Sequence, residues 1–518
     1  MIKTVGIIGA GFAGLSTAKV LKACGFEVTV FEKEPDVGGV WAASRRYPGL
    51  TTQNPRTTYA LSDFPMPEDY PEWPSGEQVQ RYLHAYAEHF GLLPAIRLDT
   101  MVNATTLDEQ QNRWTVQVTS NHTGADSAER EHQFDFLVVC NGIFSEPAIP
   151  HWEASEMFRT AGGRICHTSQ FTDAEDARGK HVLVIGYGKS SCDVANAIAE
   201  RSASTTLVAR NLIWKIPKKF LNILNFKFLM LTRMGEALFK YIEVKGFEKF
   251  LHGGGKPLRN AMMALVQSIV TIQLKLRHNG LHPGKPLETI ASGTVSLVTD
   301  GFYEKVASGG LRVKANASIR RFVGRQAVLS TGELLPVDIV ICGTGWRQQV
   351  PFFSEDLMAR ITDNTGNFRL YRSILPTHVP RLAFNGYNSS FFSQLNCEIG
   401  ALWLANYLRG GFSPPPVSVM DALIDQRLAW MVERTSGKHS RGTNITPFSM
   451  HNIDELLQDM QLQIGASKRL KQWFGPVNPS DYREVTRRLL ARHAVNADAQ
   501  HGVEEHIESL RFKQLRNP

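Results

Sequence analysis

Residues 9–14, with the sequence Gly-Ala-Gly-Phe-Ala-Gly, have the spacing of a turn that binds a dinucleotide. They follow an apolar stretch at 5–8 and precede a helical pattern that ends near Cys24. In such a turn the first glycine permits the bend, the second lets a pyrophosphate approach the backbone, and the third packs helix against strand. The free N–H groups that begin the helix then face the phosphates. The expected contacts are Gly9, Gly11, Phe12, Ala13 and Gly14.

A second turn repeats the pattern at residues 186–191, with the sequence Gly-Tyr-Gly-Lys-Ser-Ser. It lies between an apolar stretch at 182–185 and a helical pattern that ends near Arg201. Ser191 is small enough to replace the third glycine. One such turn is a weak signal, but two copies, each between a strand and a helix, predict two βαβ units. The expected contacts are Gly186, Gly188, Lys189, Ser190 and Ser191.

The residue that ends the second strand of each unit indicates which nucleotide binds there. Glu32 lies 18 residues after Gly14, and a carboxylate there accepts hydrogen bonds from ribose hydroxyls and repels a 2′-phosphate. Arg210 lies 19 residues after Ser191, and its guanidinium can bind a 2′-phosphate through two N–H groups. Lys189 adds positive charge nearby. The first unit therefore suits FAD or NAD and the second NADPH, unless Arg210 is only a solvated strand end.

These features, together with several shorter motifs, resemble the flavin-containing monooxygenases and the related Baeyer–Villiger monooxygenases. The resemblance covers roughly residues 1–410 and is weakest over 211–290. The family fingerprint F-x-G-x-x-x-H-x-x-x-(F/Y) is matched by Gly163, His167 and Phe171, although Ala161 replaces its first Phe. A terminal Phe is closer to the heteroatom-oxygenating branch. The other matching motifs are Val-Gly-Gly-Val-Trp at 37–41, Tyr-Pro-Gly at 47–49, Ser-Asp-Phe-Pro at 62–65 and Gly-Thr-Gly-Trp at 343–346.

The resemblance implies an enzyme with FAD and NADPH as cofactors. Its members form a flavin hydroperoxide and transfer one atom of O2 to an apolar small molecule, here by N- or S-oxygenation or hydroxylation. Two alternatives stay open: Baeyer–Villiger insertion beside a ketone, and an NADPH-dependent flavin oxidase or reductase. The chain has no C-x-x-C pair, which excludes a reductase that uses a redox-active dithiol.

The resemblance also suggests catalytic positions. The family's flavin-contacting Asn falls at Gln53, whose neutral amide can still make hydrogen bonds. Asn54 is adjacent, and Arg56 is the only cation close by in the sequence. His167 is the fourth candidate, although a hydrogen-bonded linker residue fits the same position equally well. Further expected cofactor contacts are Lys33, Gly39, Val40, Trp41, Thr52, Gln53 and Gly345.

The composition indicates which partners and which cellular compartment to expect. The 518 residues carry a net charge of +8, with Lys and Arg spread along the chain. This pattern favours anionic cofactors and gives no nucleic-acid-binding arm. The six cysteines are scattered, so we expect no metal site and a reducing, cytoplasmic location. No apolar run reaches the roughly 18 residues that cross a bilayer.

The predicted fold is α/β, with two Rossmann-like dinucleotide-binding domains. We expect a first part of the FAD domain at 1–155 and an NADP domain at 156–333 with a helical insertion at about 211–290. Residues 334–518 should hold the rest of the FAD domain and a mostly helical tail. The oligomeric state is not predicted.

The insertion contains two apolar helix candidates, at 220–231 and 260–276. Its basic, Phe- and Leu-rich segment 215–231 allows three interpretations. The segment could lie on a membrane surface as a peripheral contact, cover the substrate as a lid, or pack as an ordinary helical subdomain.

Overall fold

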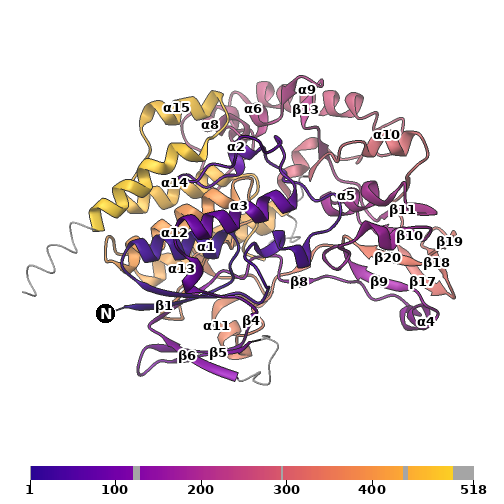
Figure 1. The fold of residues 1–518 in the computed structure, drawn as a ribbon. Coiled ribbons are helices and arrows are strands. Elements are labelled where there is room, and N and C mark those ends of the chain that lie inside the picture. The colour runs from indigo at the N-terminus through magenta and orange to yellow at the C-terminus, as the bar shows by residue number, and fades with distance from the viewer. Residues whose placement is uncertain (1, 121–128, 293–295, 436–440, 494–518) are drawn as a thin grey trace, which may run out of the picture.

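The computed structural model describes residues 2–120, 129–292, 296–435 and 441–493. Its first sheet, which contains β1 at the left of Figure 1, is parallel. The strand order is β24-β7-β1-β2-β3. The helix α1 (Phe12–Ala23) connects the first two strands and packs against the almost wholly buried α12 (Ser393–Leu408). The strands are β1 (Thr4–Ile8), β2 (Glu27–Phe31), β3 (Ile96–Arg97), β7 (Phe136–Val139) and β24 (Leu382–Phe384).

The second parallel sheet has the order β16-β11-β10-β20-β9. The helix α5 (Lys189–Ile198) connects β10 to β11, as α1 connects β1 to β2. The strands are β9 (Arg164–His167), β10 (His181–Ile185), β11 (Ser204–Ala209), β16 (Arg312–Ala315) and β20 (Ile339–Cys342). Residues 182–185 of β10 and 339–342 of β20 form continuous apolar runs, as expected of parallel strands covered on both faces. The predicted α/β fold with two dinucleotide-binding domains is confirmed.

Each parallel sheet is interrupted in the chain by a three-stranded antiparallel sheet. The first consists of β4 (Thr100–Asp108), β5 (Arg113–Ser120) and β6 (Glu129–Phe134). The second consists of β17 (Ile319–Val323), β18 (Gln326–Leu329) and β19 (Leu334–Pro336). After each of them the chain adds a strand beside the strand that leads into the glycine turn of its sheet, β7 beside β1 and β20 beside β10. The two units are therefore built alike.

The strand pairing corrects the expected boundary at residue 334. Residues 339–342 form β20, which pairs with β10 and β9 in the second sheet. The chain rejoins the first sheet only at β24, which pairs with β7. The apolar run at 339–342 suits either sheet, because each sheet contains buried parallel strands.

The insertion contains one long helix and several short elements. The candidate at 260–276 corresponds to α9 (Lys256–Gln273). The candidate at 220–231 is wrong as a single helix, because a hairpin and one helical turn occupy it. The short elements are β12 (Lys215–Ile216), β13 (Lys219–Phe220), β14 (Leu224–Asn225), α6 (Lys227–Met230), α7 (Arg233–Ala237) and α8 (Gly246–Leu251). The insertion is followed by β15 (Ser296–Leu297) and α10 (Phe302–Ala307).

The hairpin forms because backbone and tertiary contacts override the apolar pattern. Leu221 and Asn222 have φ values of 51° and 60°, and Asn tolerates this left-handed conformation. The amide of Gln273 on α9 accepts a hydrogen bond from Leu221 N (2.9 Å) and donates one to Lys219 O (2.8 Å). The apolar residues then divide between two sides, with Phe220 and Phe226 buried and Ile223 exposed.

The last part of the described chain is helical, as expected. It consists of α13 (Val417–Thr435), α14 (Ser449–Met460), α15 (Ala466–Phe474) and a helical stretch at 483–493. Within the described residues, no helix has the length and apolar character needed to cross a bilayer. The remaining elements used below are α3 (Gly76–His89) and α4 (Ser155–Thr160).

Candidate functional site

The first glycine turn connects β1 to α1, and two of its glycines are required by the fold itself. Gly9 has a φ of 106°, and a Cβ there would lie 2.6 Å from the carbonyl oxygen of Cys140. A Cβ at Gly14 would lie 1.8 Å from the carbonyl oxygen of Gly9. Larger residues at either position would clash with backbone that cannot move without opening the turn.

Gly11 is different, because neither strain nor packing requires a glycine there. Its φ of −83° and ψ of −166° are extended values that any residue adopts. A Cβ at Gly11 would have the Cα of Gly39, 3.6 Å away, as its nearest neighbour. The space above Gly11 is open, and Gly39 backs it on one side. This is the place where the pyrophosphate of a dinucleotide would lie, so the turn fits such a ligand.

The second turn, between β10 and α5, repeats this geometry. Gly186 has a φ of 109°, and a Cβ there would lie 2.5 Å from the carbonyl oxygen of Gly343. Gly188 is extended (φ −71°, ψ −179°), and a Cβ there would meet nothing within 4 Å. Ser191 takes the third position and donates its hydroxyl to Ile185 O (3.3 Å) and Gly343 O (3.2 Å). We call the open space beside the second glycine of each turn a cradle. The first cradle lies at Gly11 and the second at Gly188, one in each sheet.

Glu32 lies at the end of β2, beside the first cradle, and is 5% exposed. Its carboxylate accepts hydrogen bonds from the backbone N–H groups of Ala10 (2.7 Å) and Glu34 (3.0 Å). Burial raises the pKa of Glu32, and the two backbone donors oppose that rise. The side chain is held rigidly within the turn, and its remaining lone pairs can accept from ribose hydroxyls.

At the second cradle the two expected cations differ in availability. Arg210 is exposed at the carboxyl end of β11. Lys189 is instead 9% exposed, and its Nζ lies 2.5 and 2.6 Å from the two carboxylate oxygens of Asp193. The structure thus gives Lys189 an ion pair in place of the free charge that the sequence suggested. Recognition of a 2′-phosphate would depend on Arg210.

We expect Arg210→Ala to lower kcat/KM for NADPH by about 10- to 150-fold, the cost of losing a charge-assisted contact worth roughly 1.5–3 kcal/mol. The rate with NADH should change little, because NADH has no 2′-phosphate. Steady-state kinetics with both nucleotides measure the effect. The matched control is Arg312→Ala, which removes an exposed Arg at the amino end of β16 in the same sheet. Equal losses with both nucleotides would show that Arg210 supports structure.

The candidate catalytic residues Gln53 and Asn54 lie in the loop before α2 (Arg56–Tyr59), and Arg56 begins that helix. Their hydrogen bonds differ. Gln53 is exposed, and its Oε1 accepts the backbone N–H of Leu297 in β15 (3.1 Å). Asn54 is buried and donates its side-chain amide to Phe391 O (2.5 Å). Arg56 donates to Tyr70 O (2.7 Å). Of these three residues, only Gln53 is hydrogen-bonded to the second nucleotide-binding unit.

His167, at the end of β9, is 1% exposed and uses both ring nitrogens. Its Nδ1 accepts the backbone N–H of Ser169 (3.2 Å), so its Nε2–H donates to Gly345 O (3.1 Å). Burial lowers the pKa of His167 to about 4. The ring joins β9 to the turn after β20 as a neutral group, which is the linker arrangement rather than that of a proton donor.

This arrangement predicts a pH dependence of stability. The pKa of His167 is near 4 in the folded protein and near 6.5 in the unfolded chain. Between pH 4 and pH 6.5 the unfolded state therefore binds more protons at this residue than the folded state does. The free energy of unfolding should fall by about 2 kcal/mol from this group between pH 7 and pH 5. Urea unfolding of wild type and His167→Gln at both pH values measures the difference. Identical pH dependences would contradict a neutral His167.

The other expected cofactor contacts surround the two turns in different ways. Phe12 and Trp41 both pack edge-on against Tyr59, with ring centroids 5.6 and 5.7 Å apart. This aromatic group supports the start of α1. Gly345 has a φ of 85° and open space around it. Lys33 is exposed, Val40 and Ser190 are half-buried, and Thr52 is buried with its hydroxyl bonded to Asn54 O (2.8 Å).

Three residues that shape the cradles were not identified from the sequence. Cys140 and Gly343 follow β7 and β20, and their carbonyl oxygens pack against the first glycine of each turn. Asp193 is 1% exposed and pairs with Lys189. The spacing of Lys189 and Asp193, four residues apart on a predicted helix, was the available signal for that pair. For Cys140 and Gly343 no local pattern marks the contact, because it depends on strand order.

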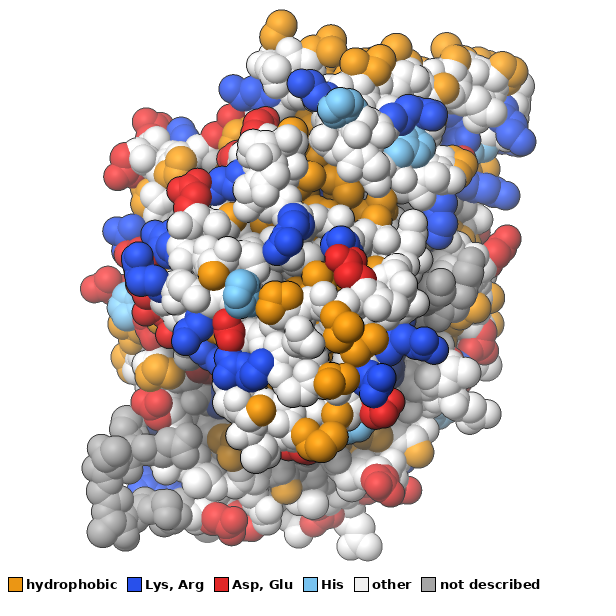
Figure 2. All heavy atoms as spheres, turned by 90° about the vertical axis from the view of Figure 1, so that its right-hand side faces the viewer, with side chains coloured by type: hydrophobic (Ala, Val, Ile, Leu, Met, Phe, Trp, Pro, Cys, Tyr) orange, Lys and Arg blue, Asp and Glu red, His pale blue; other side chains and the backbone are white. Residues whose placement is uncertain are grey.

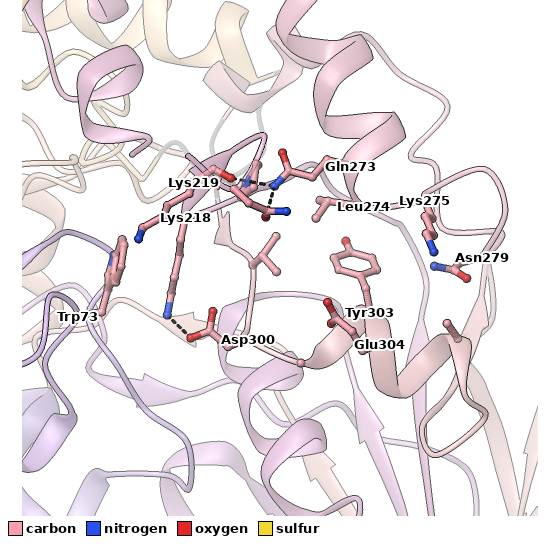
Figure 3. Close-up of a pocket in the computed structure, with 15 residues that line it drawn as sticks. Trp73, Lys218, Lys219, Gln273, Leu274, Lys275, Asn279, Asp300, Tyr303 and Glu304 are labelled. Atoms are coloured by element: carbon pink, nitrogen blue, oxygen red, sulfur yellow. Dashed lines mark hydrogen bonds and ion pairs between the residues drawn. The ribbon is translucent and has the colours of Figure 1, made fainter. Parts of the chain in front are cut away.

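A hollow of about 580 Å³ lies between the insertion and α10, away from both cradles (Figure 3). Lys218 crosses it, with its Nζ 2.6 Å from Asp300 and 4.8 Å from the ring centre of Trp73. No residue of either glycine turn lines it. Its polar rim, formed by Lys219, Lys275, Asn279 and Glu304, does not match the mostly apolar lining of a site for an apolar molecule.

Two parallel sheets, each with an open cradle at its glycine turn, define a two-nucleotide oxidoreductase of the flavoprotein class. The comparison with known families is more specific, since the model of the flavin-binding monooxygenase-like family matches residues 2–497. The chain belongs to this family. It is accordingly a flavin monooxygenase, as the resemblance had implied.

The chain is similar to named proteins over most of its length. Probable flavin-containing monooxygenase 1 of Arabidopsis thaliana is 29% identical over 520 residues, covering 92% of this chain and 96% of that protein. Dimethylaniline monooxygenase [N-oxide-forming] 2 of Rattus norvegicus is 25% identical over 515 residues, covering 94% and 89%. Among solved structures, OTEMO in complex with FAD and NADP has a TM-score of 0.68 at 17% identity, covering 88% and 97%.

Proposed function

We propose that the protein is an FAD-dependent, NADPH-consuming monooxygenase that transfers one atom of O2 to an apolar small molecule, by N- or S-oxygenation or hydroxylation. The single observation that carries this is the pair of open cradles at Gly11 and Gly188 in a chain of this family. FAD, once reduced by NADPH, supplies the oxygen chemistry. The protein's own residues bind the two nucleotides, orient them and exclude water.

The cradles divide the cofactors between the two sheets. The first cradle, with the buried carboxylate of Glu32 at its ribose position, suits the adenosine half of FAD. The second, with the exposed Arg210, suits NADPH. Gln53 lies on the loop between them and is bonded to β15. We therefore assign the reacting centre to the neighbourhood of this loop.

Within that loop, Gln53 is the best candidate to touch the reacting oxygen. Its carbonyl oxygen accepts from Leu297 N, which fixes the amide plane and leaves its NH2 group as a donor. Asn54 is buried and uses one of its two amide N–H groups to bind Phe391 O, and Arg56 uses one of its N–H groups to bind Tyr70 O. Ketone insertion calls for a cation that stabilises an oxygen anion, whereas a neutral amide suits heteroatom oxygenation. This contrast favours amines and sulfides.

Product analysis with labelled O2 and NADPH tests the function. N,N-dimethylaniline is the first probe, because one relative is named for N-oxide formation on that compound. A sulfide and a cyclic ketone complete the set. We expect one labelled oxygen in an N-oxide or sulfoxide. A labelled ester or lactone from the ketone alone would favour the Baeyer–Villiger alternative. NADPH consumption that yields only H2O2 would favour a flavin oxidase.

We expect Gln53→Ala to raise the H2O2 released per NADPH by about 2- to 12-fold, because one hydrogen bond worth roughly 0.5–1.5 kcal/mol is lost at the reacting centre. Anaerobic flavin reduction by NADPH should proceed normally. A peroxidase-coupled assay measures the leak. Asn54→Ala is the control, since its amide binds Phe391 O. A leak from Asn54→Ala but not from Gln53→Ala would transfer the role to Asn54.

We also propose a cytoplasmic location, supported by six cysteines that are all free and buried. The expected partners are the small-molecule substrate and O2, with no nucleic acid. Peripheral contact of the segment 215–231 with a membrane stays a prediction. Most of this segment is tied into the fold, since Lys215, Phe220 and Phe226 are buried.

A further inference from the structure

Lys215 is a lysine in the interior of the protein that lies against the second glycine turn. It is 2% exposed and belongs to β12, which pairs with β15 so that Lys215 lies beside Ser296. Its Nζ donates to Ser296 Oγ (3.0 Å) and lies 4.9 Å from the ring centre of Tyr187. Tyr187 stands between Gly186 and Gly188 in the chain. The ammonium group is therefore packed against the turn that forms the second cradle.

Within the described residues, no carboxylate is left to neutralise Lys215. The neighbouring Asp193 on α5 is 1% exposed, and its carboxylate already binds Lys189 Nζ (2.5 and 2.6 Å) and the hydroxyl of Thr299. The other close neighbour on α5 is the thiol of Cys192. Two lysines and one aspartate give this buried group one unbalanced positive charge. Buried charges in proteins are ordinarily paired, so this one points to an anionic ligand.

The groups around Lys215 bear on its protonation. Burial lowers the pKa of Lys215, Lys189 lowers it further, and Cys192 and Asp193 oppose the change. Burial raises the pKa of the Cys192 thiol, which keeps the thiol neutral. A nearby anion would stabilise the protonated form of Lys215. The remaining titratable groups of this cluster are phenols, whose pKa values are raised chiefly by burial: Tyr47, Tyr187 and Tyr303.

The exposed charges of the second unit differ from Lys215 in their effect on a ligand. Figure 2 views the molecule from the side of α5 and α10, and it shows Lys and Arg side chains among Asp and Glu side chains on this face. Water and salt screen such exposed charges. A charge buried against the turn is screened much less, so it attracts a phosphate at the cradle more strongly.

We propose that Lys215 is the buried cation that attracts the pyrophosphate of the nicotinamide nucleotide to the second cradle. This inference rests on the proposed function, which assigns NADPH to that cradle. The pyrophosphate would lie at Gly188, next in the chain to the tyrosine that Lys215 contacts. NADPH and NADH share the pyrophosphate, so Lys215 serves both nucleotides, whereas Arg210 distinguishes between them. Lys215 acts through its charge and is a positioning residue.

Equilibrium binding of NADP+ and NAD+ to the FAD-loaded Lys215→Met variant tests the proposal. Methionine resembles the lysine stem in length but has no charge. We expect the Kd of both nucleotides to rise by about tenfold. The matched control is Lys219→Met, which removes the same charge from an exposed position four residues along the chain. This control should change both Kd values by less than about twofold, because its charge is screened by water.

Two further measurements separate this role from a structural one. An unpaired buried charge costs stability, so Lys215→Met should raise the unfolding midpoint of the nucleotide-free protein. A lysine that only supports the fold would give a lower midpoint. Nucleotide binding should also raise the pKa of Lys215, so that the complex takes up a proton. The affinity of the wild-type protein for NAD+ should therefore fall between about pH 7 and pH 9, and that of Lys215→Met should stay constant.

The outcomes distinguish a failure of this inference from a failure of the proposed function. Wild-type Kd values in Lys215→Met would overturn the inference alone, if Gly188→Val, which fills the second cradle, abolishes nucleotide binding. Nucleotide binding that survives in Gly188→Val would contradict the proposed NADPH site, and the inference with it. A shifted flavin midpoint potential in Lys215→Met with unchanged Kd values would also overturn the inference, because the reduced flavin would then be the anion.

Discussion

The Gly11→Val variant should purify as a folded protein that has lost its FAD. The backbone at Gly11 is extended, and a Cβ there has no neighbour closer than 3.6 Å. Valine therefore fits the protein but occupies the place of the pyrophosphate. Extra methyl groups in a filled space cost about 1–3 kcal/mol or more, which lowers FAD affinity on the order of a hundredfold. The flavin absorbance per chain and circular dichroism measure loading and folding.

A second variant of the same turn distinguishes loss of FAD binding from loss of folding stability. In Gly14→Ala the new Cβ would lie 1.8 Å from Gly9 O, so this smaller substitution should destabilise the turn itself. We expect Gly14→Ala to lower the unfolding midpoint and Gly11→Val to leave the midpoint of the FAD-free protein unchanged. A yellow, fully loaded Gly11→Val protein would contradict the placement of FAD at the first cradle.

The second large effect is expected at the equivalent position of the other sheet. Gly188→Val should retain FAD but lose reduction by NADPH, again on the order of a hundredfold. Gly188 is extended, and a Cβ there would meet nothing within 4 Å. Dithionite should still reduce the flavin, because it does not use the nucleotide site. Anaerobic stopped-flow absorbance with each reductant measures the two rates.

The two valine variants control each other. Gly11→Val should lose FAD, and Gly188→Val should keep it. In Gly188→Val the rates of flavin reduction by NADPH and by NADH should fall equally, since the pyrophosphate is common to both nucleotides. In Arg210→Ala only the rate with NADPH should fall. Normal reduction of Gly188→Val by NADPH would place the second nucleotide elsewhere.

The two glycine turns could be predicted because nucleotide binding requires small residues at fixed spacing. Sharp turns, open backbone and close helix packing each restrict one position of a six-residue motif, and both copies show all three restrictions in the structure. The strand that completes each sheet was less predictable. An apolar run such as 339–342 is compatible with any buried parallel strand, so only the three-dimensional pairing assigns β20 to the second sheet.

The candidate site was predicted in part for a related reason. Gln53, Asn54 and Arg56 could be grouped from the sequence because they are neighbours in the chain. Their hydrogen-bond partners Leu297, Phe391 and Tyr70 could not be predicted. Those partners lie far along the chain or on another loop. The pairing of Lys189 with Asp193 was readable from helical spacing, whereas the hairpin at 221–222 depends on the distant Gln273.

The order of strands has a consequence for the nascent chain. The first sheet begins at β1 but is completed only by β24, after β20 has already completed the second sheet. The apolar β7 is finished at Val139, and its outer neighbour ends at Phe384. At about 5–20 residues per second, translation leaves that edge without its partner for on the order of tens of seconds. An open apolar strand edge invites pairing with other chains, so newly made protein passes through an aggregation-prone stage that the finished enzyme does not have.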